Sequence, residues 1–181
     1  MTYVMGNICG RYKKYKKLLK DIGLKMSDEL YVVGDIIGED TQSVSLLRDM
    51  SLRSNVFPIL GDREYKALKN RAESEFMNQI SMLEREQSEG ILEYLGELVL
   101  YERVDVGNSK YLLVHNFEQN KTLESIVKEL GDISDMIIVS AHDEKGDRIS
   151  RCDNRIYLNC GESENCPLCV LCLDDKKEYY A

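Results

Sequence analysis

The side chains that could bind a metal ion follow short apolar runs in this 181-residue chain. Asp35 follows the run Leu30–Gly34, and Asp62 follows the run Val56–Gly61. An apolar run that ends in glycine predicts a buried strand and a tight turn. Open α/β sheets place their ligand sites just beyond such strand ends. We therefore expect both carboxylates at one common edge of a sheet.

The chain has only two histidines, and each closes an apolar run. His115 follows Tyr111–Val114, and His142 follows Met136–Ala141. A single histidine at a strand end is usually structural or exposed. Two of them, in the same setting as two aspartates, favour a metal site instead. Carboxylates combined with imidazoles suit Mn, Fe or Zn.

Three glycine-containing blocks resemble those of the metallophosphoesterase (calcineurin-like) superfamily, in particular its serine/threonine protein phosphatase branch. That family carries Gly-Asp-x-His-Gly, Gly-Asp-x-x-Asp-Arg-Gly and Gly-Asn-His-Glu. The blocks here read Gly6-Asn7-Ile8-Cys9-Gly10, Gly34-Asp35-Ile36-Ile37-Gly38-Glu39-Asp40 and Gly61-Asp62-Arg63-Glu64. The resemblance covers almost the whole chain, from Tyr3 to about Asp174. It implies an α/β fold of two facing mixed β-sheets flanked by helices, with residues 1–181 forming a single domain.

The resemblance also implies a two-metal site, of which one half keeps its ligand positions. The bridging aspartate of the family matches Asp35. The remaining ligands of one metal match Asp62, His115 and His142, with Asp62 in place of an asparagine. An added anion should not weaken the binding of a cation. The family resemblance therefore predicts a divalent ion, Mn, Fe or Zn, at these four side chains.

The other half of the site differs from the family, because its aspartate and histidine are replaced by Asn7 and Cys9. An amide oxygen is a poor ligand beside a carboxylate. A thiolate is a soft ligand that would favour Zn, but a free cysteine is more often a small buried apolar residue. We therefore expect one ion in preference to two.

The residues that the family uses for catalysis differ as well. The histidine that protonates the leaving group matches Arg63, which does not deprotonate near neutral pH. The aspartate that orients this histidine matches Gly38, and a phosphate-binding arginine matches Glu39, which would repel phosphate. These changes favour a weak hydrolase or a non-catalytic pseudophosphatase over a normal phosphatase. We also expect Arg63 to contact either Glu39 or Asp35.

Composition restricts the partners. A net charge of −8 argues against binding to a nucleic-acid backbone. The basic run Arg11–Lys17 is interpreted as the solvated face of a helix. No apolar run reaches membrane-spanning length and no secretion signal is recognised, so we expect a cytoplasmic protein. The expected ligand is a phosphoprotein or a small phosphoester.

Four of the six cysteines cluster near the C-terminus, at Cys160, Cys166, Cys169 and Cys172. Their spacing allows a zinc knuckle or a set of buried thiols. Cys169 and Cys172 lie in an apolar strand, where residues three apart face opposite sides. Buried thiols are therefore the favoured interpretation.

The elements that position these residues follow from hydrophobic periodicity. The first third of the chain predicts alternating parallel strands and helices: strands at 3–8, 30–33 and 56–60, a helix at 12–22 and a second helix capped by Asp40 or Thr41. Residues 64–98 predict two helices interrupted at Gly90. The remainder predicts a hairpin of 98–104 with 110–115, a helix at 122–130, strands at 136–142 and 155–159, and a hairpin of 168–173 with 178–180.

Three functions remain open on the sequence alone. The chain could be a phosphoester hydrolase with one or two metals, a binding module that keeps the fold without catalysis, or a structural protein without a ligand. Bound metal would separate the third from the first two. Turnover of a phosphoester with added manganese would separate the first from the second.

Overall fold

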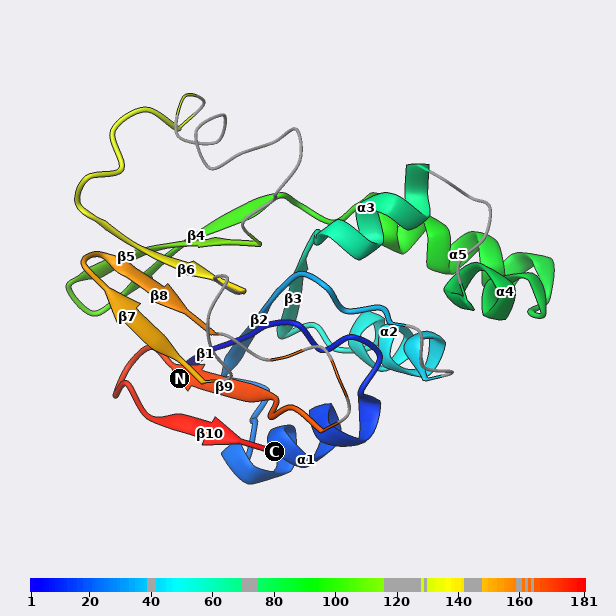
Figure 1. The fold of residues 1–181 in the computed structure, drawn as a ribbon, viewed down its shortest axis with the longest axis horizontal. Coiled ribbons are helices and arrows are strands. Elements are labelled where there is room, and N and C mark those ends of the chain that lie inside the picture. Colours follow the sequence, from blue (N-terminus) through cyan, green and yellow to red (C-terminus); the bar gives the residue numbers. More distant parts are fainter. Residues whose placement is uncertain are drawn as a thin grey trace.

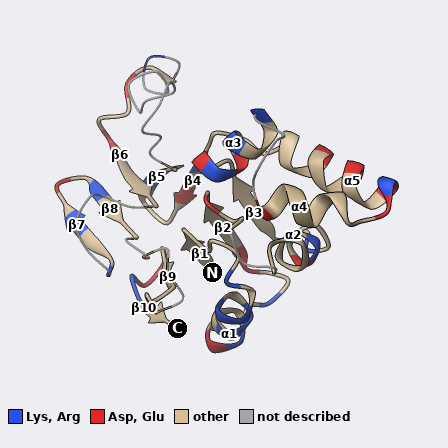
Figure 2. Ribbon diagram, turned by 45° about the vertical axis from the view of Figure 1, so that its right-hand side comes forward, with Lys and Arg blue, Asp and Glu red and all other residues tan. Residues whose placement is uncertain are grey.

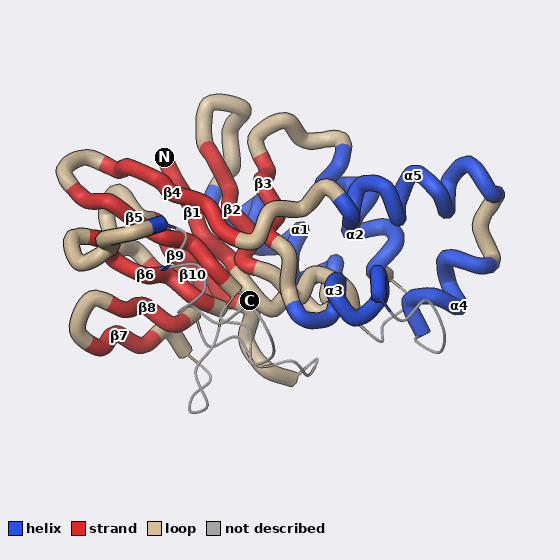
Figure 3. The backbone as a smooth tube through the Cα atoms, turned by 90° about the horizontal axis from the view of Figure 1, so that it is seen from above, coloured by secondary structure: helices blue, strands red, loops and turns tan. Residues whose placement is uncertain are grey.

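Two five-stranded β-sheets with helices beside them make up the computed structural model (Figure 1). Seen from above, the strands gather at one end and the helices α3, α4 and α5 at the other (Figure 3). This confirms the predicted fold of two mixed sheets flanked by helices. The structure describes residues 1–38, 42–69, 75–115, 128, 130–141, 148–158, 161, 163 and 165–181.

The first sheet contains the strands that carry the two aspartates. Its strand order is β10-β9-β1-β2-β3, with β1, β2 and β3 parallel and β9 antiparallel to both of its neighbours. Its middle strands are mostly apolar because both of their faces are covered, and Val4 and Met5 of β1 are fully buried. The strands span Thr2–Met5 (β1), Glu29–Val33 (β2), Val56–Ile59 (β3), Cys169–Cys172 (β9) and Glu178–Tyr180 (β10).

Two helices connect the parallel strands of this sheet. Helix α1, Tyr12–Ile22, buries Tyr15, Leu18 and Leu19, and it ends at Gly23, whose left-handed φ of 60° allows its N–H to bond the last carbonyls. Helix α2, Ser43–Ser51, buries an apolar face in the same way. Its N-cap residue is Gln42, without a side-chain cap hydrogen bond, whereas the sequence predicted Asp40 or Thr41, which lie outside the described residues.

The second sheet has the strand order β4-β5-β6-β8-β7. Strands β5, β6 and β8 are parallel, and β4 and β7 pair antiparallel at the two edges. The hairpin of β4 and β5 confirms the turn predicted at Gly107, whereas β7 was not predicted. The strands span Tyr101–Val106 (β4), Ser109–Val114 (β5), Met136–Ser140 (β6), Ser150–Cys152 (β7) and Arg155–Tyr157 (β8).

The alternation of side chains along β5 explains the direction in which His115 points. Tyr111 and Leu113 belong to the core shared with the first sheet, whereas Leu112 and Val114 belong to a separate cluster on the opposite face. Successive side chains of a strand point to opposite faces. His115 has the same parity as Tyr111 and Leu113, and it is therefore directed toward the first sheet.

The segment between the sheets folds into three helices rather than the two predicted. They are α3 (Asp62–Lys69), α4 (Glu75–Ser81) and α5 (Arg85–Gly96). Gly90 was expected to interrupt a helix, and this expectation is wrong, since it lies inside α5 with no atom within 4 Å of an added Cβ. An exposed glycine costs a helix only about 0.5–1 kcal/mol, which packing of Ile91 and Leu95 offsets. Most of the predicted helix 122–130 lies outside the described residues.

Arg11 corrects one interpretation of the sequence. It was grouped with a solvated basic run, but its side chain is 2% exposed. Its guanidinium donates to the carbonyl oxygens of Asn7, Ile8, Ser163 and Cys166. These carbonyls lie in turns rather than in a helix or sheet, and Arg11 adds a donor to each of them. The following lysines are exposed or half-buried, so basic residues gather on α1 as expected (Figure 2).

None of the helices in the described residues is both long enough and apolar enough to cross a membrane.

Candidate functional site

The turns that follow β1 and β2 lie against each other at the carboxyl edge of the first sheet. The backbone N–H groups of Asn7, Cys9 and Gly10 donate to the carbonyl oxygens of Gly34, Asp35 and Ile36 at 3.3, 2.8 and 2.7 Å. Asn7 and Cys9 are both buried. Asn7 and Cys9 therefore stand beside the turn that carries Asp35.

Three non-glycine residues in these turns adopt left-handed backbone conformations. Asn7 and Cys9 have φ of 50°, and Asp35 has φ of 47°. Such conformations cost on the order of 1–3 kcal/mol each and persist where the surrounding structure holds them. They concentrate at binding and active sites. Their grouping at one sheet edge supports a functional site there.

Glu64, in the first turn of α3, holds this edge together. Its side chain is fully buried and accepts four backbone N–H groups, from Gly61, Asp35, Ile36 and Ile37, at 2.9–3.0 Å. Burial and the charge of Asp35 raise the pKa of Glu64 to about 7, and the N–H groups together with His115 oppose that rise. Each carboxylate oxygen accepts two N–H groups, which joins the turn after β2 to the turn after β3.

The sequence did not assign Glu64 a role, although it lies in the third block of the resemblance. An acidic side chain in the first helical turn after a buried strand was the available signal, because anionic groups stabilise helix N-termini. Acidic and basic residues alternate at the start of α3 (Figure 2).

Asp35, Asp62 and His115 converge from three different strands. The Nε2 atom of His115 lies 3.3 Å from Oδ1 of Asp35 and 4.0 Å from Oδ2 of Asp62. His115 is fully buried, and the side chain of Asp35 is 6% exposed. Three of the four predicted metal ligands therefore face one another, while the fourth, His142, lies outside the described residues.

The hydrogen bond of Nδ1 determines whether Nε2 of His115 can accept or must donate. Nδ1 lies 3.0 Å from the carbonyl oxygen of Val33. A carbonyl can only accept, so Nδ1 must carry the hydrogen. In the neutral form of the imidazole, the lone pair of Nε2 faces two carboxylates, which repel it. A positive charge between these groups relieves the repulsion, and this is the usual arrangement of a histidine that binds a metal.

The donor set fits a divalent cation by its chemistry. In the described ranges of the chain, no group of three or more His, Cys, Asp or Glu side chains is arranged to hold a metal ion. The two carboxylates lie 3.3 and 4.0 Å from the same imidazole nitrogen, Nε2 of His115. The donors also match the mixed oxygen and nitrogen preference of Mn, Fe and Zn.

Arg63 reaches the same aspartate. Its Nε lies 3.5 Å from Oδ2 of Asp35, and its backbone N–H donates to Oδ1 at 3.1 Å. This confirms one of the two contacts expected for Arg63. The alternative partner, Glu39, lies outside the described residues, so that half of the prediction stays open.

Gly34 and Gly38 are required by close approaches inside the site. A Cβ on Gly38 would lie 2.1 Å from the carbonyl oxygen of Cys9, so the turn has no room for the family's aspartate at this position. A Cβ on Gly34 would lie 2.4 Å from Nδ1 of His115. Gly34 also has a left-handed φ of 74°.

Replacing Gly34 by alanine should displace His115 and lower the free energy of unfolding by roughly 2 kcal/mol or more, through overpacking and backbone strain. Urea unfolding measures the loss. Gly90→Ala is the matched control and should raise stability by about 0.5–1 kcal/mol, because its site is open and helical. Equal stability of Gly34→Ala and the wild type would contradict the packing described here.

Two of the three described cysteines of the C-terminal cluster are buried. Cys169 and Cys172 are both buried in β9, as predicted. The thiol of Cys169 lies 3.2 Å from the carbonyl oxygen of Leu158, and burial raises the pKa of Cys172. Cys166 is half-buried with Ser163 Oγ 3.2 Å from its sulfur, and Cys160 lies outside the described residues.

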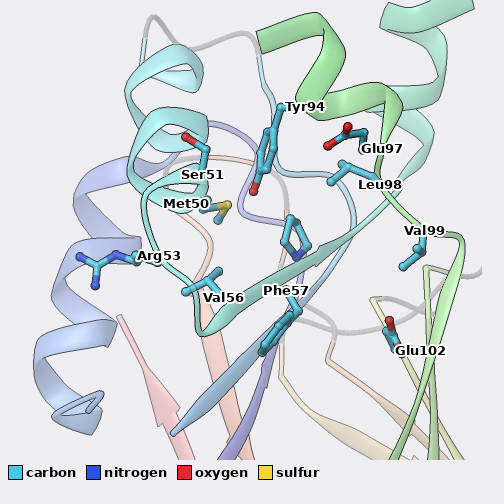
Figure 4. Close-up of a pocket in the computed structure, with 11 residues that line it drawn as sticks. Met50, Ser51, Arg53, Val56, Phe57, Tyr94, Glu97, Leu98, Val99 and Glu102 are labelled. Carbon is cyan, nitrogen blue, oxygen red and sulfur yellow. The ribbon is translucent and has the colours of Figure 1, made fainter. Parts of the chain in front are cut away.

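A pocket of about 270 Å³ lies elsewhere, between α2, α5 and the edge strand β3 (Figure 4). Phe57 and Tyr94 line it together with the carboxylates of Glu97 and Glu102. Asp35, Asp62 and His115 do not line it. The pocket is therefore separate from the carboxylate and histidine site.

Comparison of sequences finds curated relatives of one kind, and no protein-family profile matches the chain. A symmetrical bis(5'-nucleosyl)-tetraphosphatase of Acidovorax sp. (strain JS42) is 31% identical over 119 residues, which are 62% of this chain and 42% of that protein. The same enzyme of Shewanella loihica is 38% identical over 65 residues, which are 35% of this chain and 24% of that protein. The matched region spans less than half the length of these relatives.

Comparison of structures shows the fold. A structure whose description proposes a diadenosine tetraphosphatase aligns over 99% of this chain and 92% of its own length, with a TM-score of 0.72 and 16% identity. A metallophosphoesterase from Sphaerobacter thermophilus aligns over 99% of this chain and 86% of its own, with a TM-score of 0.63 and 11% identity. The chain therefore has the fold of metallophosphoesterases.

Proposed function

We propose that this chain is a metal-dependent phosphoesterase domain with one retained metal position and low turnover. The observation that carries the proposal is the position of His115. Its Nε2 lies 3.3 Å from one carboxylate and 4.0 Å from another, and its Nδ1 is directed to a backbone carbonyl. The fold of phosphoesterases around these three side chains supports the same chemistry.

Asp35, Asp62 and His115 would hold the ion, with His142 as the fourth expected ligand. A bound divalent ion polarises a phosphoryl oxygen and lowers the pKa of water, which supplies the nucleophile for hydrolysis. Val33 fixes the ring orientation of His115 through its carbonyl, and Glu64 fixes the turn that carries Asp35. These contacts keep the ligands in place before the ion binds.

Low turnover follows from the side chains around the ligands. Arg63 lies where the family has a general acid, and it cannot donate a proton near neutral pH. Asn7 and Cys9 replace the carboxylate and imidazole of the other metal position. The negative charge of Glu39, which matches a phosphate-binding arginine of the family, would further weaken phosphate binding.

We propose a small phosphoester or phosphoanhydride as the substrate, in preference to a phosphoprotein. The curated relatives are named for the hydrolysis of bis(5'-nucleosyl) tetraphosphates, and this supports a small nucleotide-like substrate. A serine/threonine phosphatase activity rests on the block resemblance alone. A non-catalytic phosphate-binding module is the second candidate, because Arg63 places a permanent cation at the site without a proton to donate.

The test compares turnover with manganese and with a chelator on a bis(5'-nucleosyl) tetraphosphate, an aryl phosphate and a phosphopeptide. We expect slow manganese-dependent hydrolysis of the first two, at least about a hundredfold below an intact relative because no general acid is present. Asp35→Asn should abolish it, whereas the exposed control Asp21→Asn should not. Manganese-independent turnover would contradict the metal dependence, and no turnover on any substrate would contradict a catalytic role.

A further inference from the structure

Arg63 contacts both oxygens of the aspartate that is expected to bind the metal. Its backbone N–H donates to Oδ1 of Asp35 at 3.1 Å, and its Nε lies 3.5 Å from Oδ2. Nε2 of His115 approaches Oδ1 from 3.3 Å. The carboxylate therefore already has a guanidinium on one oxygen and an imidazole at the other.

The guanidinium carries a permanent positive charge, since arginine does not deprotonate in proteins. A divalent ion on Asp35 would add a second cation close to the first, in a setting where Asp35 is 6% exposed and screening by water is small. Two cations that share one buried carboxylate repel each other. Either the ion binds more weakly, or the guanidinium moves away.

Arg63 is placed so that its side chain can move. It is the second residue of α3, and its side chain is 28% exposed, in contrast to the fully buried His115. Its backbone contact to Asp35 does not depend on the side chain. The guanidinium can therefore turn toward solvent while the turn around Asp35 stays in place.

We infer that Arg63 is an internal cation that competes with the divalent metal for Asp35, so that metal binding requires the guanidinium to leave this carboxylate. Arg63 is thus a residue that sets metal affinity rather than a catalytic acid. This inference rests on the proposed function, because it assumes that Asp35 is a ligand.

Calorimetric titration of the full chain with manganese chloride tests the competition. Arg63→Gln removes the charge and keeps a polar side chain, and it should bind manganese about tenfold more tightly than the wild type, a typical coupling between two ligands. Arg63→Lys keeps the charge and should bind as weakly as the wild type. Arg53→Gln is the matched control, because Arg53 forms a similar pair with Asp49, with Nε 2.8 Å from Oδ2, outside the site. It should leave the affinity unchanged.

Thermal melting supplies a second readout that needs no turnover. Without metal, Arg63→Gln should melt below the wild type, because Asp35 loses its counter-charge. With saturating manganese, its melting temperature should rise further than that of the wild type. Melting also verifies that each variant is folded at the titration temperature.

The outcomes separate the inference from the proposed function. Tight binding by Arg63→Gln alone would support the competition and contradict metal use by the wild type. Equal affinities of the wild type and Arg63→Gln would overturn the competition and leave the proposed function standing. Binding by neither protein would overturn both.

Discussion

Replacing Glu64 by alanine is expected to lower the free energy of unfolding by about 3–5 kcal/mol, because it leaves four backbone N–H groups without their buried acceptor. These N–H groups belong to the turns after β2 and β3, so the loss should also disorder the position of Asp35. Urea unfolding followed by circular dichroism measures the change. The free energy of unfolding of Glu64→Gln should lie between those of Glu64→Ala and the wild type, since one of the two acceptor oxygens remains.

The exposed Glu89 provides the control for this experiment. It pairs with Arg85 on the surface of α5, where its side chain is 62% exposed. Glu89→Ala should change the free energy of unfolding by no more than about 1 kcal/mol, the range of exposed ion pairs. A similar small effect at Glu64 would mean that the carboxylate does not organise the two turns.

Replacing Arg63 by histidine is expected to raise turnover about ten- to a hundredfold above that of Arg63→Gln, because only histidine adds a group that can protonate the leaving oxygen. Both variants remove the guanidinium from Asp35, so the comparison isolates proton transfer from metal affinity. Steady-state hydrolysis of a bis(5'-nucleosyl) tetraphosphate at saturating manganese is the measurement.

The gain should stay below the full effect of a general acid. The family orients its histidine with an aspartate, and Gly38 cannot be replaced by one, since an added Cβ would lie 2.1 Å from the carbonyl oxygen of Cys9. Equal turnover of the histidine and glutamine variants would show that proton donation does not limit the reaction. The acid would then have to be sought elsewhere in the site.

Local pattern predicted the elements that carry the site. Short apolar runs that end in Gly34 and Gly61 gave buried parallel strands, and the run before His115 gave a strand whose alternation directs the histidine inward. Hydrophobic periodicity and turn-forming residues act over only a few neighbouring positions, so one sequence is enough to predict these elements. The fold itself came from the resemblance of the blocks.

Local sequence pattern could not predict the contacts between segments that are distant in the sequence. Arg11 was grouped with exposed lysines, yet its guanidinium joins carbonyls near residue 8 to carbonyls near residue 165. Glu64 likewise serves N–H groups 27 to 29 residues away. Both side chains are charged, buried and bonded to backbone groups that lie far away in the sequence. Hydrophobic periodicity does not reveal such long-range contacts. The prediction for Gly90 failed for a different reason. Packing of helix α5 outweighs the low helix propensity of this glycine.

These features form one arrangement at the carboxyl edge of the first sheet. Glu64 fixes the turns, Val33 fixes the ring of His115, and Arg63 supplies a positive charge to Asp35. Under the proposed function, Asp35, Asp62 and His115 would keep one metal position, and the altered neighbours would lower turnover. Metal binding is therefore the property on which the account depends.

The most direct test is the metal content of the purified chain after equilibration with manganese and removal of free ion. The account predicts about one manganese ion per chain, as expected for one retained half of a two-metal site, and almost none in His115→Ala. Two ions per chain would contradict the loss of the position at Asn7 and Cys9. Equal metal content in the wild type and His115→Ala would contradict the site itself.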